Sequence, residues 1–408
     1  MTAGEEEILK KQQLRNNEYY NTQEIQDSLY NKSKEGYIFK DLISIIVDKR
    51  NKSLAYRNIK NNKGSNTPGV NGTTIKDIDQ YEISEWTNYI NRRFERFKPM
   101  AVRRVEIAKL GGGSRPLGIP SIEDRMIQQC IKQVLEPIVE AKFYHGSYGF
   151  RPDRSAENAI AKVMHLINKN KLHYAVDVDI KGFFDNINHG KLLKQMWTMG
   201  IRDKKLIVII SSMLKAEIKE VGIPDKGVPQ GVVSTLLANI VLNELDWWIY
   251  SQWEGMKTKE YLHQRSKIES LKKGNLKEMY IVRYADDFKI LTSNYKSAQK
   301  TFIAVERWLK ERLKLDINKE KSKVINLRKN YSKFLGFKMK AKKKRRKYVV
   351  KSRISSKAKS KIIENCRNQI EKIKNKPRTY NINKLNSMIL GWHNYYRIAT
   401  HVSLVLVK

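Results

Sequence analysis

The sequence predicts an α+β protein in which a β-sheet is backed by helices. Apolar and polar residues alternate with a period of two on both sides of Tyr284-Ala285-Asp286-Asp287, which is typical of two strands joined by a tight turn. Residues 174–180 are rich in β-branched side chains and indicate another strand. Residues 122–143 and 354–375 instead show helical spacing of apolar side chains. Strands and helices therefore occupy separate stretches, as in α+β folds.

The first hundred residues predict helices and loops. Residues 1–40 are polar and favour helices with little core of their own, whereas 42–59 place apolar residues at helical spacing. Residues 63–72 are rich in Gly, Asn and Pro and predict a loop. A short strand is expected at 105–107, and a flexible hairpin tip at 111–114 follows it.

The central part of the chain contains the expected sheet. Pro137 is expected to kink the helix over 122–143 or to separate its last turn. A second helix is expected over about 189–196, directly after the strand at 174–180. Residues 247–279 are highly charged and predict an inserted connection ahead of the Asp-Asp hairpin.

The composition changes after about residue 340. The block 342–347 is entirely basic, and helical patterns follow over 354–375 and 381–398. By itself such a block is usually a solvated face or a targeting tract. We expect three regions, which are an N-terminal part (1–100), a central part (101–340) and a basic, all-helical C-terminal part (341–408).

Charge and cysteine content restrict the function. The 408 residues include 80 Lys and Arg against 42 Asp and Glu, a net charge of +38, which indicates a polyanionic partner. No basic amphipathic helix with a clean apolar face and no membrane-spanning apolar run is found, which disfavours a membrane surface. Two cysteines and an acidic N-terminus without the apolar core of a secretory signal favour a reducing compartment. We expect a cytoplasmic protein that handles nucleic acid.

Acidic residues form the candidate catalytic group. Asp286 and Asp287 would repel each other at a tight turn unless a cation neutralised them. Asp177 and Asp179 share one face of the strand at 174–180 and could supply a third carboxylate. Such a set suits Mg²⁺ and phosphoryl transfer, with two ions bridged by the carboxylates. A solvated Asp-Asp turn is the alternative, and Asp185 is a competing acid for which we expect a helix-capping role.

A Pro-Gln-Gly turn separates the two acidic segments. It lies within residues 227–239 and opens an apolar helix, where glycine allows close approach of the backbone to a ligand and Gln230 could act as a polar finger. By itself, the Pro-Gln-Gly turn is weak support for a ligand-binding site.

In this order and spacing, the segments resemble the reverse transcriptases encoded by group II introns, the intron maturases. The resemblance rests on Arg115-Pro116-Leu117-Gly118-Ile119-Pro120, Asp124-Arg125, Ser147-Tyr148-Gly149-Phe150-Arg151-Pro152, Asp179–Asp185, the Pro-Gln-Gly block, Tyr284–Asp287, residues 315–323, Phe334-Leu335-Gly336-Phe337 and 391–397. It runs from about residue 30 to the C-terminus. It implies a right-hand polymerase fold with fingers and palm over 101–340 and a basic helical thumb or maturase region over 341–408. It also implies an N-terminal extension with a basic RNA-binding region over 1–100.

The resemblance also implies roles for individual residues. It makes Asp179, Asp286 and Asp287 the catalytic and metal-binding acids, with two Mg²⁺ ions or Mn²⁺ in their place. It implies that Lys109 and Arg115 clamp the triphosphate and that Gln230 and Gly231 lie beside the nucleotide. It also implies that the ring of Phe184 blocks a ribose 2′-hydroxyl and that Lys321 donates a proton to pyrophosphate. The equally weighted alternatives are that Phe184 is an ordinary core aromatic residue and that Lys321 is an ordinary solvated lysine.

The expected function is an RNA-directed DNA polymerase that copies group II intron RNA from a DNA primer with dNTPs and assists splicing and mobility. The alternatives are an RNA-binding splicing cofactor with dispensable polymerase activity, or a domesticated or defence-associated reverse transcriptase. Ala108, Asn71 and Thr235 depart from the usual family residues Pro, Asp and Pro. The last region is expected to be a shortened thumb, and the oligomeric state is left open.

Overall fold

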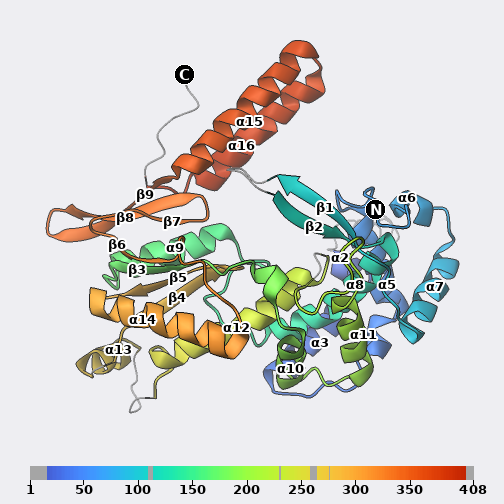
Figure 1. Cartoon of the computed structure of the whole chain (residues 1–408), viewed down its shortest axis with the longest axis horizontal. Helices are drawn as coiled ribbons and strands as arrows, with labels where there is room; N and C mark the ends of the chain where they lie inside the picture. The colour runs from blue at the N-terminus through green and yellow to red at the C-terminus, as the bar shows by residue number, and fades with distance from the viewer. Residues whose placement is uncertain (1–15, 109–113, 229–230, 258–263, 275, 401–408) are drawn as a thin grey trace, which may run out of the picture. The chain divides into compact units, whose positions relative to one another are not determined.

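The computed structural model describes residues 16–108, 114–228, 231–257, 264–274 and 276–400 (Figure 1). The chain forms two compact units, each assembled from separate stretches of sequence. Unit 1 comprises residues 1–144, 182–244 and 312–315, and unit 2 comprises 145–181, 245–311 and 316–408. Both units mix helices with strands, which confirms the α+β fold class.

Unit 1 is mainly helical. Its elements are α2 (Asn16–Tyr19), α3 (Gln23–Lys34), α4 (Ile43–Ile46), α5 (Lys49–Lys60), α6 (Ile75–Ile78), α7 (Ile83–Glu95), β1 (Arg103–Ala108), β2 (Ser114–Ile119), α8 (Ile122–Glu140), a 3₁₀ turn (Phe183–Asn186), α10 (His189–Thr198), α11 (Lys204–Leu214) and the first part of α12 (Ser234–Gln252).

Helix α8 is the centre of unit 1. The Ser121 hydroxyl caps it by accepting a hydrogen bond from Asp124 N at 3.1 Å. Thirteen of its 19 residues are buried, and α3, α4, α5 and α7 pack against it. The helix continues through Pro137 to Glu140, so its last turn is not separated as expected. Burial against several neighbours outweighs the one backbone hydrogen bond that proline removes.

Strands β1 and β2 form the expected antiparallel hairpin, with Ile107 opposite Arg115. Its tip, residues 109–113, lies outside the described residues. The strand expected at 105–107 is longer, and it begins at Arg103. Arg103 and Arg104 are consecutive charged residues without alternation, so the start of the strand is hidden in the sequence.

Unit 2 contains the expected sheet. Its elements are the last part of α12, α9 (Ala156–Asn168), β3 (Tyr174–Val178), α13 (Gln264–Lys273), β4 (Met279–Tyr284), β5 (Asp287–Thr292), α14 (Tyr295–Trp308), β6 (Lys323–Asn326), β7 (Ser332–Phe334), β8 (Phe337–Lys344), β9 (Lys347–Ile354), α15 (Ser356–Asn375) and α16 (Thr379–Tyr396), with a π-helical turn (Leu309–Leu313) after α14.

The four-stranded sheet of unit 2 has the order β4-β5-β3-β6 and is antiparallel throughout. Helix α9 packs on β4 and β5, and α14 packs on β3, β5 and β6. All residues of β4 except Tyr284 are buried, as are all residues of β5 except Asp287. The acids therefore lie where two buried strands reach the surface.

The C-terminal region is helical only from Ser356, so an all-helical region beginning at residue 341 is wrong. Strands β7, β8 and β9 form an antiparallel sheet first, and the basic block 342–347 lies at the β8–β9 turn with every side chain exposed. Phe337, Met339 and Ala341 are buried at every second position of β8. This period of two is the sign of a strand, and the lysines between these residues hid it. Helices α15 and α16 then pack side by side (Figure 1).

Two further expectations need correction. Asp185 lies in the 3₁₀ turn and does not cap α10, because Asn188 does so by accepting a hydrogen bond from Lys191 N. Residues 247–279 are not one inserted connection, since α12 extends to Gln252 and α13 follows. None of the described helices is long and apolar enough to cross a membrane.

Candidate functional site

The two acids lie at the turn from β4 to β5, with Asp286 in the loop and Asp287 as the first residue of β5. Tyr284 pairs with Asp287, so Ala285 and Asp286 form a two-residue loop. Ala285 has φ of +56°, a left-handed conformation that costs a non-glycine residue about 1 kcal/mol. The hairpin predicted from the alternating pattern is confirmed, and its turn holds a strained backbone next to two carboxylates.

Strand β3 brings the third acid to the same end of the sheet. The last residue of β3, Val178, pairs with Phe288, which directly follows Asp287. Asp179 is the next residue after Val178 and so leaves the sheet at the level of Asp287. Because side chains alternate along strands, Asp179 and Asp287 are on the face that carries Asp177 and Lys289.

The structure separates the roles of Asp177 and Asp179. Lys289 Nζ donates to Asp177 Oδ1 at 2.5 Å, and Ser332 Oγ donates to Asp177 Oδ2 at 2.8 Å. Lys289 is 2% exposed, so this is an internal ion pair. Asp179 is 46% exposed, and its described ion pair is with Lys321 Nζ at 3.6 Å. The carboxylate of Asp177 is therefore neutralised inside the protein, and that of Asp179 is accessible to a ligand.

The environment of Asp287 disfavours its charged form. Its side chain keeps access to solvent at the end of β5, but the surrounding protein atoms displace much of its water. This desolvation raises the pKa of Asp287 to about 6, with Asp177 and Asp286 adding repulsion while Lys289 opposes the shift. A cation bound here would relieve the repulsion between the carboxylates.

The Asp177–Lys289 pair yields a stability prediction. We expect Lys289→Met to lower the free energy of unfolding by about 3 kcal/mol, because it leaves a largely buried carboxylate without its cation. The double variant Asp177→Leu/Lys289→Met should recover most of this loss, since an apolar pair needs no desolvation of charges. Urea unfolding measures both variants. Equal stability of Lys289→Met and wild type would show that the pair is not a structural element.

Oxygen ligands at the turn fit a hard divalent cation. Asp179, Asp286 and Asp287 offer carboxylate oxygens, the donors that Mg²⁺ prefers. Within the parts of the chain that the structure describes, no three His, Cys, Asp or Glu residues are grouped as a metal site. The donor chemistry thus fits the ion, and the structure gives no coordination geometry.

Five expected nucleotide contacts belong to unit 1, and the structure describes them to different extents. Phe184 is half-buried in the 3₁₀ turn, with its ring centroid 5.4 Å from that of Phe183. Arg115 lies on β2 near the hairpin tip, and only its backbone is described. Lys109 and Gln230 fall outside the described residues.

Gly231 has a packing reason to be glycine. A Cβ on it would collide with the side-chain amide of Gln128, and Gln128 Oε1 accepts a hydrogen bond from Val232 N at 2.9 Å. Ser234 Oγ donates to Gly231 O at 2.7 Å and so holds the start of α12. In the structure, the backbone at Gly231 and Val232 comes close to the Gln128 side chain of α8.

Arg283, Asp246 and Lys289 form buried contacts that sequence reasoning missed. Arg283 and Asp246 are bonded to each other with neither side chain exposed. The available signal was a charged residue within an otherwise apolar strand, Arg283 in β4 and Lys289 in β5. Such residues are almost never buried without a partner.

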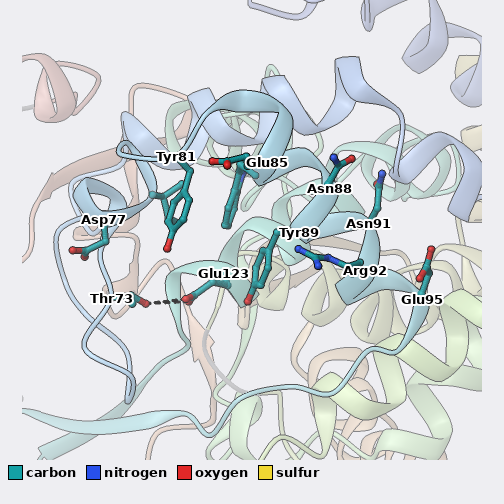
Figure 2. A pocket seen from close by; sticks show the side chains of 12 residues that line it. Thr73, Asp77, Tyr81, Glu85, Asn88, Tyr89, Asn91, Arg92, Glu95 and Glu123 are labelled. Carbon is teal, nitrogen blue, oxygen red and sulfur yellow. Dashed lines mark hydrogen bonds between the residues drawn. The ribbon is translucent and has the colours of Figure 1, made fainter.

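Unit 1 also contains a cavity of about 880 Å³ with a mainly acidic lining (Figure 2). Its charged lining residues are four acids and one arginine, namely Asp77, Glu85, Glu95, Glu123 and Arg92. Figure 2 shows Glu123 accepting a hydrogen bond from Thr73 Oγ1, at 3.0 Å. An acidic lining of this kind repels phosphate, so we do not place nucleotide or RNA backbone in this cavity.

Comparison with known proteins identifies the family. The model of the reverse transcriptase (RNA-dependent DNA polymerase) family matches residues 107–339, more than half of the chain. The chain belongs to this family. Protein YkfC of Escherichia coli is 30% identical over 316 residues, which cover 73% of this chain and 82% of YkfC.

Intron-encoded proteins are also similar to this reverse transcriptase. The group II intron-encoded protein LtrA of Lactococcus lactis is 31% identical over 65% of this chain and 49% of its own length. The putative COX1/OXI3 intron 2 protein of Saccharomyces cerevisiae is 29% identical over 76% of this chain and 40% of its own length. The chain is thus a reverse transcriptase, an RNA-directed DNA polymerase, and it is similar to intron-encoded proteins. It spans about half the length of these intron-encoded relatives.

Proposed function

We propose that this reverse transcriptase extends a DNA primer on an RNA template by a two-metal mechanism. Asp179, Asp286 and Asp287 would hold two Mg²⁺ ions, which Mn²⁺ could replace. The observation that supports this proposal most is the register of β3, β4 and β5, which brings the three acids to one end of the sheet while Lys289 neutralises Asp177. When bound, the ions activate the primer 3′-hydroxyl and stabilise the charge of the leaving pyrophosphate.

The remaining residues bind and orient the nucleotide in this proposal. Lys109 and Arg115 clamp the triphosphate, for which the planar, forked guanidinium is well suited. Gln230 and Gly231 lie beside the nucleotide, and the ring of Phe184 blocks a ribose 2′-hydroxyl and so selects dNTPs. Lys321 is held near Asp179 at 3.6 Å and would donate a proton to pyrophosphate.

The proposed biological template is group II intron RNA. The intron-encoded relatives support this choice, and they favour it over a splicing cofactor with dispensable polymerase activity or a domesticated enzyme. Binding the same RNA would assist splicing and mobility. The proposed location of the protein is the cytoplasm.

Primer extension on RNA and DNA templates by wild type and Asp286→Ala tests the proposed polymerase site, because product should form only with the acid present.

The exposed block at the β8–β9 turn predicts salt-dependent RNA binding. Each neutralised phosphate releases counterions, so the logarithm of affinity should fall steeply with the logarithm of salt concentration. Lys343→Gln/Lys344→Gln should reduce this slope by roughly one, at about 0.7 per phosphate contact on single strands. Fluorescence anisotropy at 50 to 300 mM KCl, roughly the range in which such slopes are measured, checks it.

A matched control is available on α11. Lys204→Gln/Lys205→Gln removes the same charge from two exposed lysines outside the block, and its slope should stay near that of wild type. A flat slope for the wild type, or equal slopes for the two variants, would contradict a specific phosphate grip by the block.

A further inference from the structure

A buried ion pair lies next to the turn that carries the acids. Arg283 on β4 and Asp246 on α12 both have fully buried side chains. Arg283 Nε lies 2.9 Å from each carboxylate oxygen of Asp246, and Nη2 donates to Oδ2 at 2.6 Å. This two-armed arrangement fixes the plane of the guanidinium group.

The third nitrogen of the guanidinium reaches the turn itself. Arg283 Nη1 donates to Ala285 O at 2.9 Å. Asp246 orients the guanidinium, and the guanidinium in turn holds the carbonyl that precedes Asp286. A lysine has a single nitrogen on a flexible stem and cannot hold both groups in this fixed fork.

The backbone of the turn is also held from a second side. Arg283 N donates to Gly146 O at 3.0 Å, and Tyr148 N donates to Arg283 O at 2.8 Å. Gly149 approaches Ala285 so closely that a Cβ on it would collide with Ala285 N. The turn is therefore fixed between the segment 146–149 and the guanidinium of Arg283.

Stability alone does not account for this arrangement. A buried ion pair contributes little net stability, and an apolar pair of similar volume often does as well. The hydrogen bond to Ala285 O is what an apolar pair cannot supply. That bond acts on the residue with φ of +56°, directly before two carboxylates whose direction decides where cations bind.

We propose that Arg283, oriented by Asp246, is a positioning residue that fixes the Ala285 carbonyl and thereby the direction of the Asp286 and Asp287 carboxylates. The inference rests on the proposed catalytic role of these acids. It assigns no contact with nucleotide or metal to Arg283. Its expected effect is on turnover and on the use of Mg²⁺, because misplacement by about 1 Å can cost on the order of 10²-fold in rate.

The decisive variant is Arg283→Met/Asp246→Leu, which retains an apolar pair and removes the bond to Ala285 O. We expect it to fold and to bind RNA as the wild type does, with a similar KM for dNTP. Its kcat in primer extension should fall by about 10²-fold, and the Mg²⁺ concentration for half-maximal rate should rise severalfold. Wild-type kcat together with a wild-type Mg²⁺ midpoint would overturn the inference.

A second variant covers the case in which the double variant does not fold. Arg283→Lys keeps the charge beside Asp246 and loses the fork, so it should show the same two changes to a smaller extent. Val305→Ala is the control, because it opens a cavity at a fully buried position of α14 in the same unit. It should lower the thermal midpoint while kcat per folded molecule and the Mg²⁺ midpoint stay unchanged. If Arg283→Lys behaves like Val305→Ala, the role of Arg283 is structural and the inference fails.

Asp286→Ala measured in parallel separates this inference from the proposed site. An inactive Asp286→Ala with wild-type kinetics in both Arg283 variants would remove the positioning role and leave the acids in place. A fully active Asp286→Ala would remove the acid assignment, and the positioning inference with it.

Discussion

Asp286→Ala should reduce Mg²⁺-dependent primer extension on an RNA template by on the order of 10³-fold or more. Loss of one ligand weakens binding of the cation, and the charge stabilisation that such a cation gives to a phosphoryl-transfer transition state amounts to several kcal/mol. The side chain is on the two-residue loop between β4 and β5, so its removal leaves the paired strands intact. Gel-resolved primer extension over a range of Mg²⁺ concentrations measures the effect.

The control for Asp286→Ala is an exposed acid outside the site. Asp225→Ala removes the same charge from a solvent-exposed bend in unit 1 and should leave extension unchanged. Circular dichroism should show both variants folded. Extension by Asp286→Ala at the wild-type rate would refute the proposed assignment of the acid.

Asp286→Ala also separates cDNA synthesis from assistance of splicing. If the protein assists splicing of a group II intron through RNA binding alone, Asp286→Ala should still support splicing at the wild-type rate while it makes no cDNA. Loss of both activities together would indicate that the acids serve more than polymerisation.

Asp179→Asn and Asp177→Asn should differ by at least about 10²-fold in kcat. Asp179 is half-exposed and would bind a cation, so replacing it by the neutral amide should reduce kcat by on the order of 10³-fold. Asp177 is neutralised by Lys289 and accepts a hydrogen bond from Ser332, so its replacement should change kcat by less than about tenfold while it lowers stability. Single-turnover kinetics on equal amounts of folded protein measures kcat, and urea unfolding measures stability.

The double variant Asp177→Asn/Lys289→Met refines this comparison. It removes both charges of the internal pair, so any residual effect on kcat cannot come from an unpaired Lys289. A loss of kcat as large as that of Asp179→Asn would mean that Asp177 is needed as much as Asp179, and it would contradict the assignment of Asp179 alone as the third acid.

The local sequence was sufficient for the elements around the site. Alternation on both sides of Asp286 predicted β4 and β5, and the β-branched run predicted β3, and the structure confirms all three strands. β4 and β5 are buried at every position but one, so a short apolar run next to a turn also marks them. Alternation was hidden in β8, where lysines occupy every outward position and dominate the composition. The expectation of an all-helical region from residue 341 was wrong because it rested on the basic composition and not on the alternation of apolar residues in β8.

The reverse transcriptase family was recognisable from motif order alone, because residue types and their spacing are local properties of a chain. The sequence by itself determined the α+β class, the hairpin turn with Asp286 and Asp287, and the choice of Asp177 or Asp179 as a third acid. Only the tertiary structure decided that Lys289 neutralises Asp177 while Ser332 donates a hydrogen bond to it, and that Asp246 orients Arg283 toward Ala285. Asp246 is 37 residues from Arg283, and Asp177 is 112 residues from Lys289 and 155 from Ser332, so only folding brings these partners within hydrogen-bonding distance.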